Sequence, residues 1–416
     1  MMTPALPVSD PSPGDHLHRA TAGSVAEVAA VFLRLGCMSF GGPIAHLGYL
    51  RAELVEKRRW IDDAQLGDLV ALCQFLPGPA SSQVVFAMGM QRAGLPGALL
   101  ASACFTLPSA LLMVGFAYGV ATVGNLQGAG WLHGLKLAAV VVVAQAVWGM
   151  GKKLCTDRAR VSLCLAAAAI VLAFPSALAQ LGVIAGAGVV GLRLYRNDLT
   201  PAPSPTRAGG WRGHAVAGSA LLVFLVLLVV LPALSSATGS RAIAELDSFY
   251  RSGSLVFGGG HVVLPLLRAE VVPRGWLTDE QFLAGYGAAQ ALPGPMFAFA
   301  AYLGSAMNPG DRSWLGGIWC LLAIFLPAWL LIGGALPFWH RLRAKRWAQA
   351  ALAGANASVV GILLAALYNP VFTEGVRGGA DAVAALVGFG LLEHWRAPPW
   401  LVVVGMAAAG QWLLPA

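Results

Sequence analysis

The 416-residue sequence has few charged residues, which make up only 11% of it. Soluble domains carry about 25% charged residues. In their place stand long apolar runs: 57% of the residues are hydrophobic and the mean hydropathy is +0.70. Several runs between residue 24 and the C-terminus reach the length of about 18 residues that a membrane-crossing helix needs. They do not alternate as barrel strands do, so a helical membrane protein is expected.

Motifs for several other classes of protein are also missing. The six cysteines form no CxxC pair and the eight histidines show no ligand spacing, so neither a metal site nor a cofactor is expected. The sequence contains no phosphate-binding loop and no paired nucleophile and base, which argues against an ATP-driven pump and against an enzyme. The net charge of +8 needs no nucleic-acid partner, because cytoplasmic loops of membrane proteins gather Lys and Arg.

Thirteen apolar segments can be marked out, with boundaries good to a few residues. They are 24–40, 64–90, 97–121, 131–150, 161–174, 177–194, 214–236, 242–258, 281–307, 314–337, 349–370, 378–393 and 399–415. Residues 1–23 lack an apolar core, so they are predicted to be a cytoplasmic tail and not a cleaved signal peptide. Residues 195–213 are polar and rich in Pro and Gly, which is typical of a linker. The short segments 161–174 and 177–194 are expected to pack as a tight hairpin.

The chain contains an internal repeat. FLRLGCMSFGGPIAHLGYLRAEL begins at residue 32 and FYRSGSLVFGGGHVVLPLLRAEV at residue 249. Further on, Leu-Pro-Gly-Pro occurs at residue 76 and again at residue 292. So many identities in register predict two homologous transporter repeats, 24–194 and 237–416, joined by the linker and by a connecting transmembrane helix at 214–236.

Six segments precede the linker and the connecting helix has no counterpart, so the repeats should have opposite orientations in the membrane. The prediction is therefore an all-α polytopic membrane protein of about 13 transmembrane or re-entrant helices in two inverted-topology repeats. The basic loops after the fourth, sixth and tenth segments then lie in the cytoplasm. The basic loop 51–60 does not fit, because this count places it outside, unless residues 43–58 lie at the interface or an early segment does not cross fully.

The two Leu-Pro-Gly-Pro motifs should break the helices that contain them. Such a break survives in a membrane only if it is buried in protein or lines a wet cavity. The half-helix that restarts after the break has free N–H groups and a positive dipole end, which bind anions. The first copy adds hydroxyl donors where the second has Met and Phe, so the two sites cannot be equivalent. The alternative is a structural kink. The predicted substrate-binding residues at the breaks are Pro77, Gly78, Pro79, Ser81, Ser82, Pro293, Gly294 and Pro295, flanked by Gln74 and Gln290.

Charged and amide side chains inside apolar runs extend this set. Arg34 and Arg251 occupy equivalent positions, and each either binds an oxyanion or pairs with an acid such as Glu27 or Glu245. Lys136 lies inside an apolar run with Asn356 at the matching place in the second half, which would make an asymmetric substrate site. Alternatively, Lys136 reaches the interface from a helix start.

A second set of repeated residues is assigned to gating or coupling. It comprises the Phe-Gly-Gly turns and the Arg-x-Glu motifs: Phe40, Gly41, Gly42, Arg51, Glu53, Phe257, Gly258, Gly259, Arg268 and Glu270. The arginines could form structural ion pairs with Asp63 and Asp279 at the next helix start, and the glutamates could carry a proton.

Taken together, FGGPIAH, RAEL, WIDD, QFLPGP and their second copies resemble the chromate ion transporter family in its long, two-domain form, over about 24–415. The resemblance implies a multi-pass protein of the bacterial inner membrane that exports chromate with energy from the proton gradient. It also implies a link to sulfate, the isostere of chromate. The expected partners are therefore chromate or sulfate and membrane lipid. A sulfate or other oxyanion carrier and an anion channel remain alternatives, and the sequence leaves open whether the protein forms a homodimer.

Overall fold

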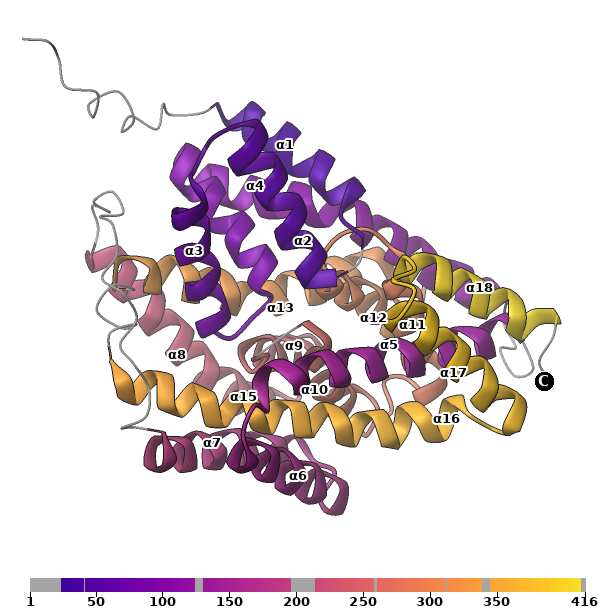
Figure 1. Cartoon of the computed structure of the whole chain (residues 1–416). Coiled ribbons are helices and arrows are strands. Elements are labelled where there is room, and N and C mark those ends of the chain that lie inside the picture. The colour runs from indigo at the N-terminus through magenta and orange to yellow at the C-terminus, as the bar shows by residue number, and fades with distance from the viewer. Residues whose placement is uncertain are drawn as a thin grey trace, which may run out of the picture.

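The structure is a computed structural model, and it describes residues 24–40, 42–123, 130–195, 214–257, 260–310, 313–338 and 345–412. Within these ranges every regular element is a helix (Figure 1). The helices α4, α5, α8, α13 and α15 contain stretches long and apolar enough to cross a membrane. This confirms an all-helical protein with the character of a polytopic membrane protein. The predicted tail 1–23 and nearly all of the predicted linker lie outside the described residues.

The first repeat contains eight helical elements, followed by the connecting helix α8 (His214–Thr238). The eight are α1 (Val25–Met38), α2 (Gly42–Arg51), the π-helical turn η1 (Ala52–Lys57), α3 (Asp63–Phe75), α4 (Ala80–Val123), α5 (Gly130–Leu154), α6 (Arg158–Ala173) and α7 (Ala177–Leu194). Side-chain caps fix several starts: Ser24 accepts from the Glu27 amide, and Asp62 forms a capping box with Gln65 before α3.

The second repeat follows the same order with shorter pieces. It contains α9 (Arg241–Ser254), η2 (Gly260–Val262), α10 (Val263–Val271), α11 (Asp279–Ala291), η3 (Met296–Ala298), α12 (Phe299–Met307), α13 (Ser313–Ala335), η4 (Leu336–Phe338), α15 (Arg346–Ala366), η5 (Leu367–Phe372), α16 (Thr373–Gly375), α17 (Gly379–Glu393) and α18 (Pro399–Trp412). Thr278 and Gln281 form a capping box before α11, as Asp62 and Gln65 do before α3.

The first repeat opens with two helical hairpins. In hairpin A, α1 is followed by α2 and η1, and Arg58 after η1 reaches back to Glu27 at the start of α1, with Nη1 3.3 Å from Oε1. In hairpin B, α3 is followed by residues 80–92 of α4, and the Arg92 guanidinium lies over the Trp60 ring, 4.6 Å from its centroid. Helix α4 then bends at Ala93 and Gly94, which have non-helical backbone angles. The predicted spans 24–40 and 64–90 are therefore arms of hairpins that turn back, as Figure 1 shows for α3 and α4.

The second repeat opens with the same two hairpins. In hairpin A′, α9 and α10 are joined by Arg251, whose Nη1 lies 3.2 Å from Glu270 Oε1. In hairpin B′, α11 and α12 lie side by side, and the Tyr302 hydroxyl donates to the Gln281 carbonyl at 2.8 Å. The predicted spans 242–258 and 281–307 are thus hairpin arms as well. The expectation of transmembrane or re-entrant helices left both forms open, because an apolar run of this length fits one crossing or two folded arms equally well.

Close helix contacts join each hairpin A to the long helix of its own repeat. A Cβ added to Gly36 of α1 would lie 2.6 Å from the Phe105 carbonyl oxygen of α4. A Cβ added to Gly253 of α9 would lie 2.3 Å from the Ile324 carbonyl oxygen of α13. Both glycines therefore permit a close approach of the two helix backbones.

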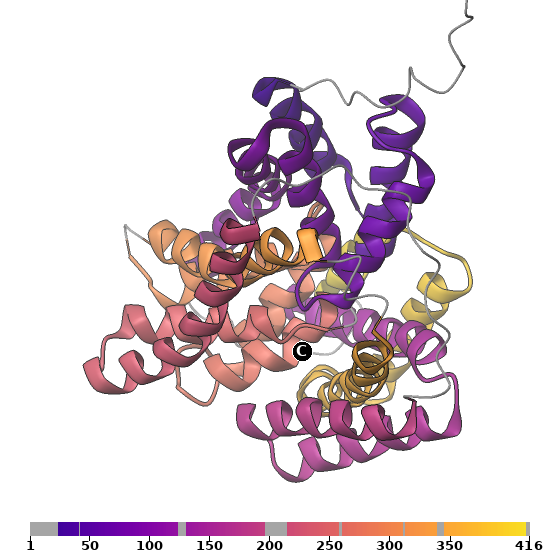
Figure 2. The same cartoon turned by 90° about the vertical axis from the view of Figure 1, so that its left-hand side faces the viewer.

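The helices that end each repeat pack against the other repeat. Helix α5 packs against α17 and α18, and α15 packs against α6 and α7 (Figures 1 and 2). Glycines permit both contacts, because a Cβ on Gly134 would meet the Met406 carbonyl oxygen and one on Gly354 would meet the Ala187 carbonyl oxygen, each at 2.0 Å. Helices α6 and α7 touch each other, but their main contact is with α15. The two repeats are therefore interleaved and cannot be separated as compact units.

Candidate functional site

Both Leu-Pro-Gly-Pro motifs break their helices, as predicted, and each forms the tip of a hairpin. Residues 76–79 connect α3 to α4, and residues 292–295 connect α11 to η3. Gly78 has φ = +123° and Gly294 has φ = +101°, a backbone conformation that residues with a Cβ rarely adopt. Glycine is thus required at the same point of both turns.

Two equivalent hydrogen bonds join the tips of opposite repeats. The Gly78 amide donates to the Val256 carbonyl at 2.7 Å, and the Gly294 amide donates to the Ser39 carbonyl at 2.8 Å. Ser39 and Val256 are equivalent residues, each directly before a Phe-Gly-Gly turn. The tip of hairpin B therefore touches the tip of hairpin A′, and the tip of hairpin B′ touches that of hairpin A. The amides of Gly78 and Gly294 are therefore engaged in the contact between the repeats.

Each break also lies against the proline-containing helix of the other repeat. A Cβ on Gly78 would be 3.1 Å from the Ala328 Cβ, next to Pro327 in α13. A Cβ on Gly294 would be 2.7 Å from Ser109 Oγ, next to Pro108 in α4. The four hairpin tips and these two helices thus form the centre of the interface between the repeats.

The start of α4 supplies free polar groups at this centre. Its first intrahelical hydrogen bond runs from the Gln83 amide to the Pro79 carbonyl at 2.9 Å, so the amides of residues 80–82 precede the bonded turns. Ser82 Oγ and Gln83 Oε1 are buried and have no hydrogen-bond partner in the described structure. Gln83 Nε2 is engaged, since it donates to the Pro77 carbonyl at 2.8 Å. The positive end of the α4 dipole and an unpartnered hydroxyl therefore face the same place.

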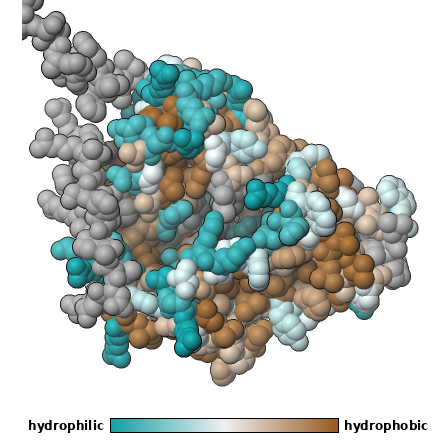
Figure 3. All heavy atoms as spheres, in the orientation of Figure 1, coloured by the Kyte–Doolittle hydropathy of each residue, from teal (hydrophilic) through white to brown (hydrophobic). Residues whose placement is uncertain are grey.

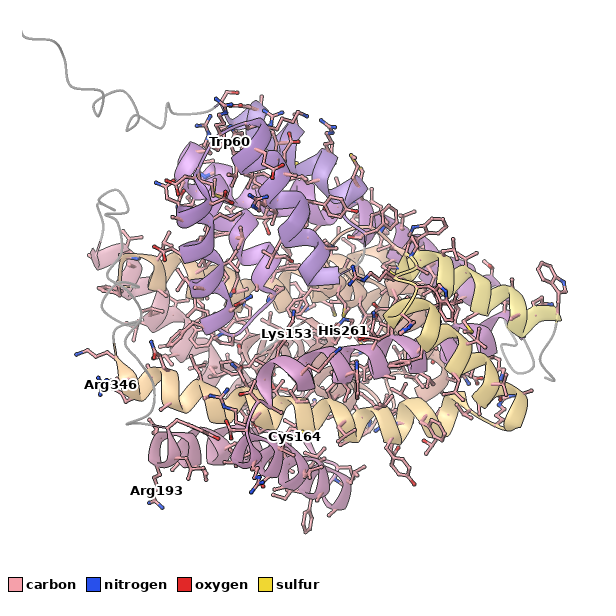
Figure 4. All side chains as sticks on the ribbon, viewed as in Figure 1. Trp60, Lys153, Cys164, Arg193, His261 and Arg346 are labelled. Carbon is pink, nitrogen blue, oxygen red and sulfur yellow. The ribbon has the colours of Figure 1, made fainter. Side chains whose placement is uncertain are left out.

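His46 in α2 links two tips, although the sequence did not assign it to the site. Its Nε2 lies 3.0 Å from the Ser39 carbonyl oxygen and its Nδ1 lies 3.3 Å from Ser81 Oγ. A carbonyl only accepts, so Nε2 carries the hydrogen and Nδ1 accepts from the Ser81 hydroxyl in the neutral ring. In the second repeat, His261 Nδ1 pairs with the Tyr286 hydroxyl at 2.9 Å, near the middle of the molecule (Figure 4). Each histidine follows a Phe-Gly-Gly turn, and this was the sequence signal.

The predicted side chains near the first break are exposed, whereas their counterparts are not. Arg34 on α1 is exposed and makes no ion pair with any described residue. Gln74, just before the break, is also exposed. Gln290 is partly buried, and its Nε2 has no partner among the described residues.

Arg251 occupies the position equivalent to Arg34 but is held by two acids. Its Nη2 lies 2.5 Å from Asp247 Oδ2, and its Nη1 lies 3.2 Å from Glu270 Oε1. The side chains of Asp247 and Glu270 are only 4% and 6% exposed. The ion-pair alternative therefore holds for Arg251, with acids other than those named from the sequence.

The repeated Arg-x-Glu motifs form ion pairs at the hairpin bases. Arg51 binds both carboxylate oxygens of Asp63, at 2.6 and 3.1 Å, and Arg268 binds Asp279 in the same way, at 2.6 and 3.0 Å. Both pairings were among the sequence alternatives. The hydrogen bonds that Arg51 donates to Asp63 raise the pKa of Arg51, with the charges of Asp63 and Glu56 adding to it, so Arg51 stays charged.

The glutamates of these motifs are paired as well. Glu53 binds Arg58 with Oε1 2.7 Å from Nε, and Glu270 binds Arg251 and Arg274. At the Phe-Gly-Gly turns, Phe40 contacts Trp400 with ring centroids 6.5 Å apart, Phe257 is partly buried, and Gly42 begins α2. Gly41, Gly258 and Gly259 lie outside the described residues.

Lys136 does not have a free charge. It is 3% exposed, and its Nζ lies 2.8 Å from Glu280 Oε1 at the start of α11. Asn356 on α15 has a buried Oδ1 without a partner in the described structure. Lys136 therefore bridges the repeats by an ion pair, and the expectation of a cation directly available to the substrate is not supported.

On the face drawn in Figure 3, hydrophilic residues gather around a hollow near the middle, while hydrophobic residues dominate the lower and right-hand parts. Helix α8 also presents an apolar surface, because only 11% of its 18-residue apolar stretch is buried. A polar centre and an apolar exterior are the arrangement expected of a membrane carrier. Among the described residues, no three or more His, Cys, Asp or Glu side chains group as a metal site would require.

Comparison with known proteins gives one family. The chromate transporter family matches residues 26–192 and again residues 243–411, once in each repeat. The chromate transport protein of Pseudomonas aeruginosa is 30% identical over 94% of this chain and 92% of its own length. The chromate transport protein of Cupriavidus metallidurans is 26% identical over 97% of this chain and 98% of its own. An uncharacterized transporter of Methanocaldococcus jannaschii is 26% identical over 86% of this chain and 87% of its own. No solved structure matches.

Proposed function

The chain belongs to the chromate transporter family, and on that premise we propose that it carries chromate across the bacterial inner membrane as a secondary transporter. The named relatives are transport proteins and not enzymes. The observation that carries the proposal is the junction of the four hairpin tips, where two reciprocal hydrogen bonds join the repeats beside unpartnered polar groups. Broken helices at a repeat interface are where secondary transporters bind their substrates.

The first break forms the binding site in this proposal. Chromate is a tetrahedral dianion, and helix N-termini and arginine are the protein groups best suited to such an oxyanion. The amides of residues 80–82 and the Ser82 hydroxyl supply donors, while Ser81 is positioned by its hydrogen bond to His46. Arg34, Gln74 and Gln290 complete the set from the adjoining hairpins. Arg251 and Lys136 support the site through their ion pairs and do not bind substrate.

The hairpins also support the inverted orientation of the repeats. Because hairpins A and B return to the side they start from, the helices that cross between them and hairpins A′ and B′ are the second part of α4 and helices α5, α6, α7 and α8. With this odd number of crossings, the two pairs of hairpins in our proposal enter from opposite faces of the membrane. The basic segment 51–59 then lies on the same face as the basic loops at 152–160, 193–212 and 341–346, which removes the anomaly in the charge distribution. That face is the cytoplasm.

Export in exchange for entering protons is the direction we propose. Rocking of one repeat against the other would open the tip junction alternately to each face, with the Phe-Gly-Gly turns and the Arg-x-Glu pairs as the parts that move. Sulfate has the same shape and charge as chromate and enters the proposal as a competitor. An anion channel would use the same tips without coupling.

The test is uptake of radiolabelled chromate into inverted membrane vesicles with an imposed proton gradient. We expect accumulation that excess sulfate reduces and that collapse of the gradient abolishes. Arg34→Ala and Gln74→Ala should lower uptake at least tenfold while the protein remains folded and inserted. Unchanged uptake in both variants would overturn the site, and conductance without accumulation would favour a channel.

A further inference from the structure

A buried acid–histidine pair lies outside the tip junction, between α5 and α17. His133 Nε2 lies 2.9 Å from Asp381 Oδ1, and the two side chains are 4% and 5% exposed. Asp381 Oδ2 accepts a hydrogen bond from the Arg377 backbone amide at 2.8 Å. Each carboxylate oxygen thus accepts a hydrogen bond, as the charged form of the acid can.

His133 Nδ1 is the atom that nothing uses. It is buried and has no hydrogen-bond partner in the described structure. Because Nε2 must donate to the carboxylate, Nδ1 of the neutral ring carries a bare lone pair in a buried place. A buried polar atom without a partner is costly to a fold, by about 1–3 kcal/mol, so a structural role alone does not explain it.

The equivalent interface on the other side of the molecule supports this view. Helix α15 packs on α6 and α7 as α5 packs on α17 and α18, but through close glycine contacts such as Gly354 with Ala187 and Gly191. No ion pair joins α15 to α6 or α7 among the described residues. The same packing is therefore achieved without buried ionisable groups, and His133 and Asp381 are additions to it.

The charges around the pair leave its carboxylate without a cation. Lys136, one helical turn from His133, is neutralised by Glu280. Six further charged residues lie on the elements that pack against α5 or between them: Asp279, Arg346, Glu374, Arg377, Glu393 and Arg396, the last of which is exposed. Asp279 is paired with Arg268 and Glu393 with Lys152, while Glu374 and Arg377 have exposed side chains and Arg346 begins α15 and is exposed. Helix α18 has no titratable residue. Protonation of His133 at Nδ1 is therefore the change that gives Asp381 a buried counter-charge.

We propose that the His133–Asp381 pair is the site where the coupling proton binds during transport. The step is a proton transfer: an O–H bond of hydronium from the outer aqueous phase breaks, an N–H bond forms at Nδ1, the neutral imidazole becomes imidazolium, and water is left behind. Helix α5 belongs to the first repeat and α17 to the second, so the protonated pair strengthens a contact between repeats and the deprotonated pair weakens it. The inference depends on the proposed function, because in that topology the pair lies near the outer face, from which protons enter.

The experiment uses the full-length protein in proteoliposomes and two readouts. One is chromate accumulation driven by an imposed proton gradient, and the other is chromate–chromate counterflow at equal pH, which needs no net proton movement. The variants are Asp381→Asn and His133→Gln. Glu393→Gln is the matched control, because Glu393 lies on the same helix in an exposed ion pair with Lys152.

We expect each variant to lose gradient-driven accumulation at least tenfold and to keep counterflow within about twofold of wild type, while the control keeps both. Accumulation at the wild-type level in either folded variant would overturn the inference, as would loss of both readouts in the two folded variants, which indicates a structural role. If Asp381→Asn does not fold, His133→Gln alone decides between these outcomes. If neither variant folds, Asp381→Glu replaces both, and the proton uptake per chromate transported is measured with an internal pH dye. Absence of counterflow in the wild type would instead overturn the proposed function.

Discussion

The two repeats share a frame but not its chemistry. Both contain two hairpins, a glycine with positive φ at the Pro-Gly-Pro tip, and a hydrogen bond from that glycine to the other repeat. At the tips, however, Ser82 of the first repeat corresponds to Ala298 of the second, and His46 corresponds to Val263. The exposed Arg34 corresponds to Arg251, which two carboxylates hold.

This difference shows which features position the site and which act in it. The repeated features are the breaks, the reciprocal hydrogen bonds and the base ion pairs, and these fix where the tips meet. The features present once are the Ser82 hydroxyl and His46, which lie at the first break, and Arg34 on α1 of the same repeat, which is unpaired among the described residues. One anion site near α4 is therefore expected, in place of two equivalent sites. The predictions below test this division, beginning with the largest expected effect.

Replacing either tip glycine with alanine should reduce transport to the same extent. Gly78→Ala and Gly294→Ala each force a Cβ into a backbone conformation with strongly positive φ, which costs about 1–3 kcal/mol in backbone strain before the contacts are counted. We expect transport to fall below a tenth of wild type in both, measured as chromate uptake per folded protein. Gly115→Ala is the control, because a Cβ there meets nothing within 4 Å. A large effect at one tip only would contradict the shared frame.

The equivalent arginines should fail in different ways. Arg251→Gln leaves the buried Asp247 without its partner and Glu270 with Arg274 as its remaining cation, and should lower the free energy of unfolding by about 3–5 kcal/mol. Arg34→Gln should leave stability unchanged and raise the apparent KM for chromate about tenfold, which corresponds to about 1.4 kcal/mol. Thermal unfolding in detergent and uptake kinetics measure the two effects. Adding Asp247→Asn to Arg251→Gln should restore part of the stability, and equal behaviour of Arg34 and Arg251 would contradict the assignment.

The hydroxyl at the first break should matter more than one placed at the second. Ser82→Ala removes a donor to a charged ligand, worth about 1.5–3 kcal/mol, so chromate affinity should fall roughly 10- to 100-fold. Ala298→Ser introduces the equivalent hydroxyl in the second repeat and should change affinity less than about twofold. Equilibrium binding of chromate to the purified protein reports both values. A comparable loss in the two variants would indicate two equivalent sites.

The base ion pairs have the same geometry but different burial, and this predicts the smallest effect. The Arg51 and Asp63 side chains are 50% and 61% exposed, whereas those of Arg268 and Asp279 are 24% and 26% exposed. Double-mutant cycles should give a smaller coupling energy for the exposed pair than for the less exposed one, because solvent screens the exposed charges. Equal coupling energies would show that burial does not separate the two repeats here.

The sequence predicted the features that repeat locally and missed those that depend on distant contacts. Leu-Pro-Gly-Pro must interrupt a helix wherever it stands, and Arg51 and Asp63 are near enough along the chain for their pairing to be foreseen. The pairing of Lys136 with Glu280 joins residues 144 positions apart, and nothing local signals it. His46 bonds to Ser39 and Ser81 only because hairpins A and B fold against each other.

The sequence left open which segments are re-entrant hairpins, because hydropathy measures the length of an apolar run and not its direction. A run of two arms joined by Pro-Gly-Pro has the same composition as one interrupted span. The basic segment 51–60 was the sequence evidence for the hairpins, since an excess of Lys and Arg on the outer face is unusual. Once hairpins A and B turn back, this segment and the other basic loops lie on one face.

The most direct test of the account is the sidedness of the two pairs of hairpins. Lys57→Cys and Pro273→Cys place single exposed cysteines at equivalent bases, in a variant with Cys37, Cys104 and Cys155 changed to Ala. The measurement is labelling by a membrane-impermeant maleimide in intact cells and in inverted vesicles. We predict that the cysteine at 57 reacts only in inverted vesicles and the cysteine at 273 only in intact cells. Labelling of both from the same side would contradict hairpins that enter from opposite faces and meet at their tips.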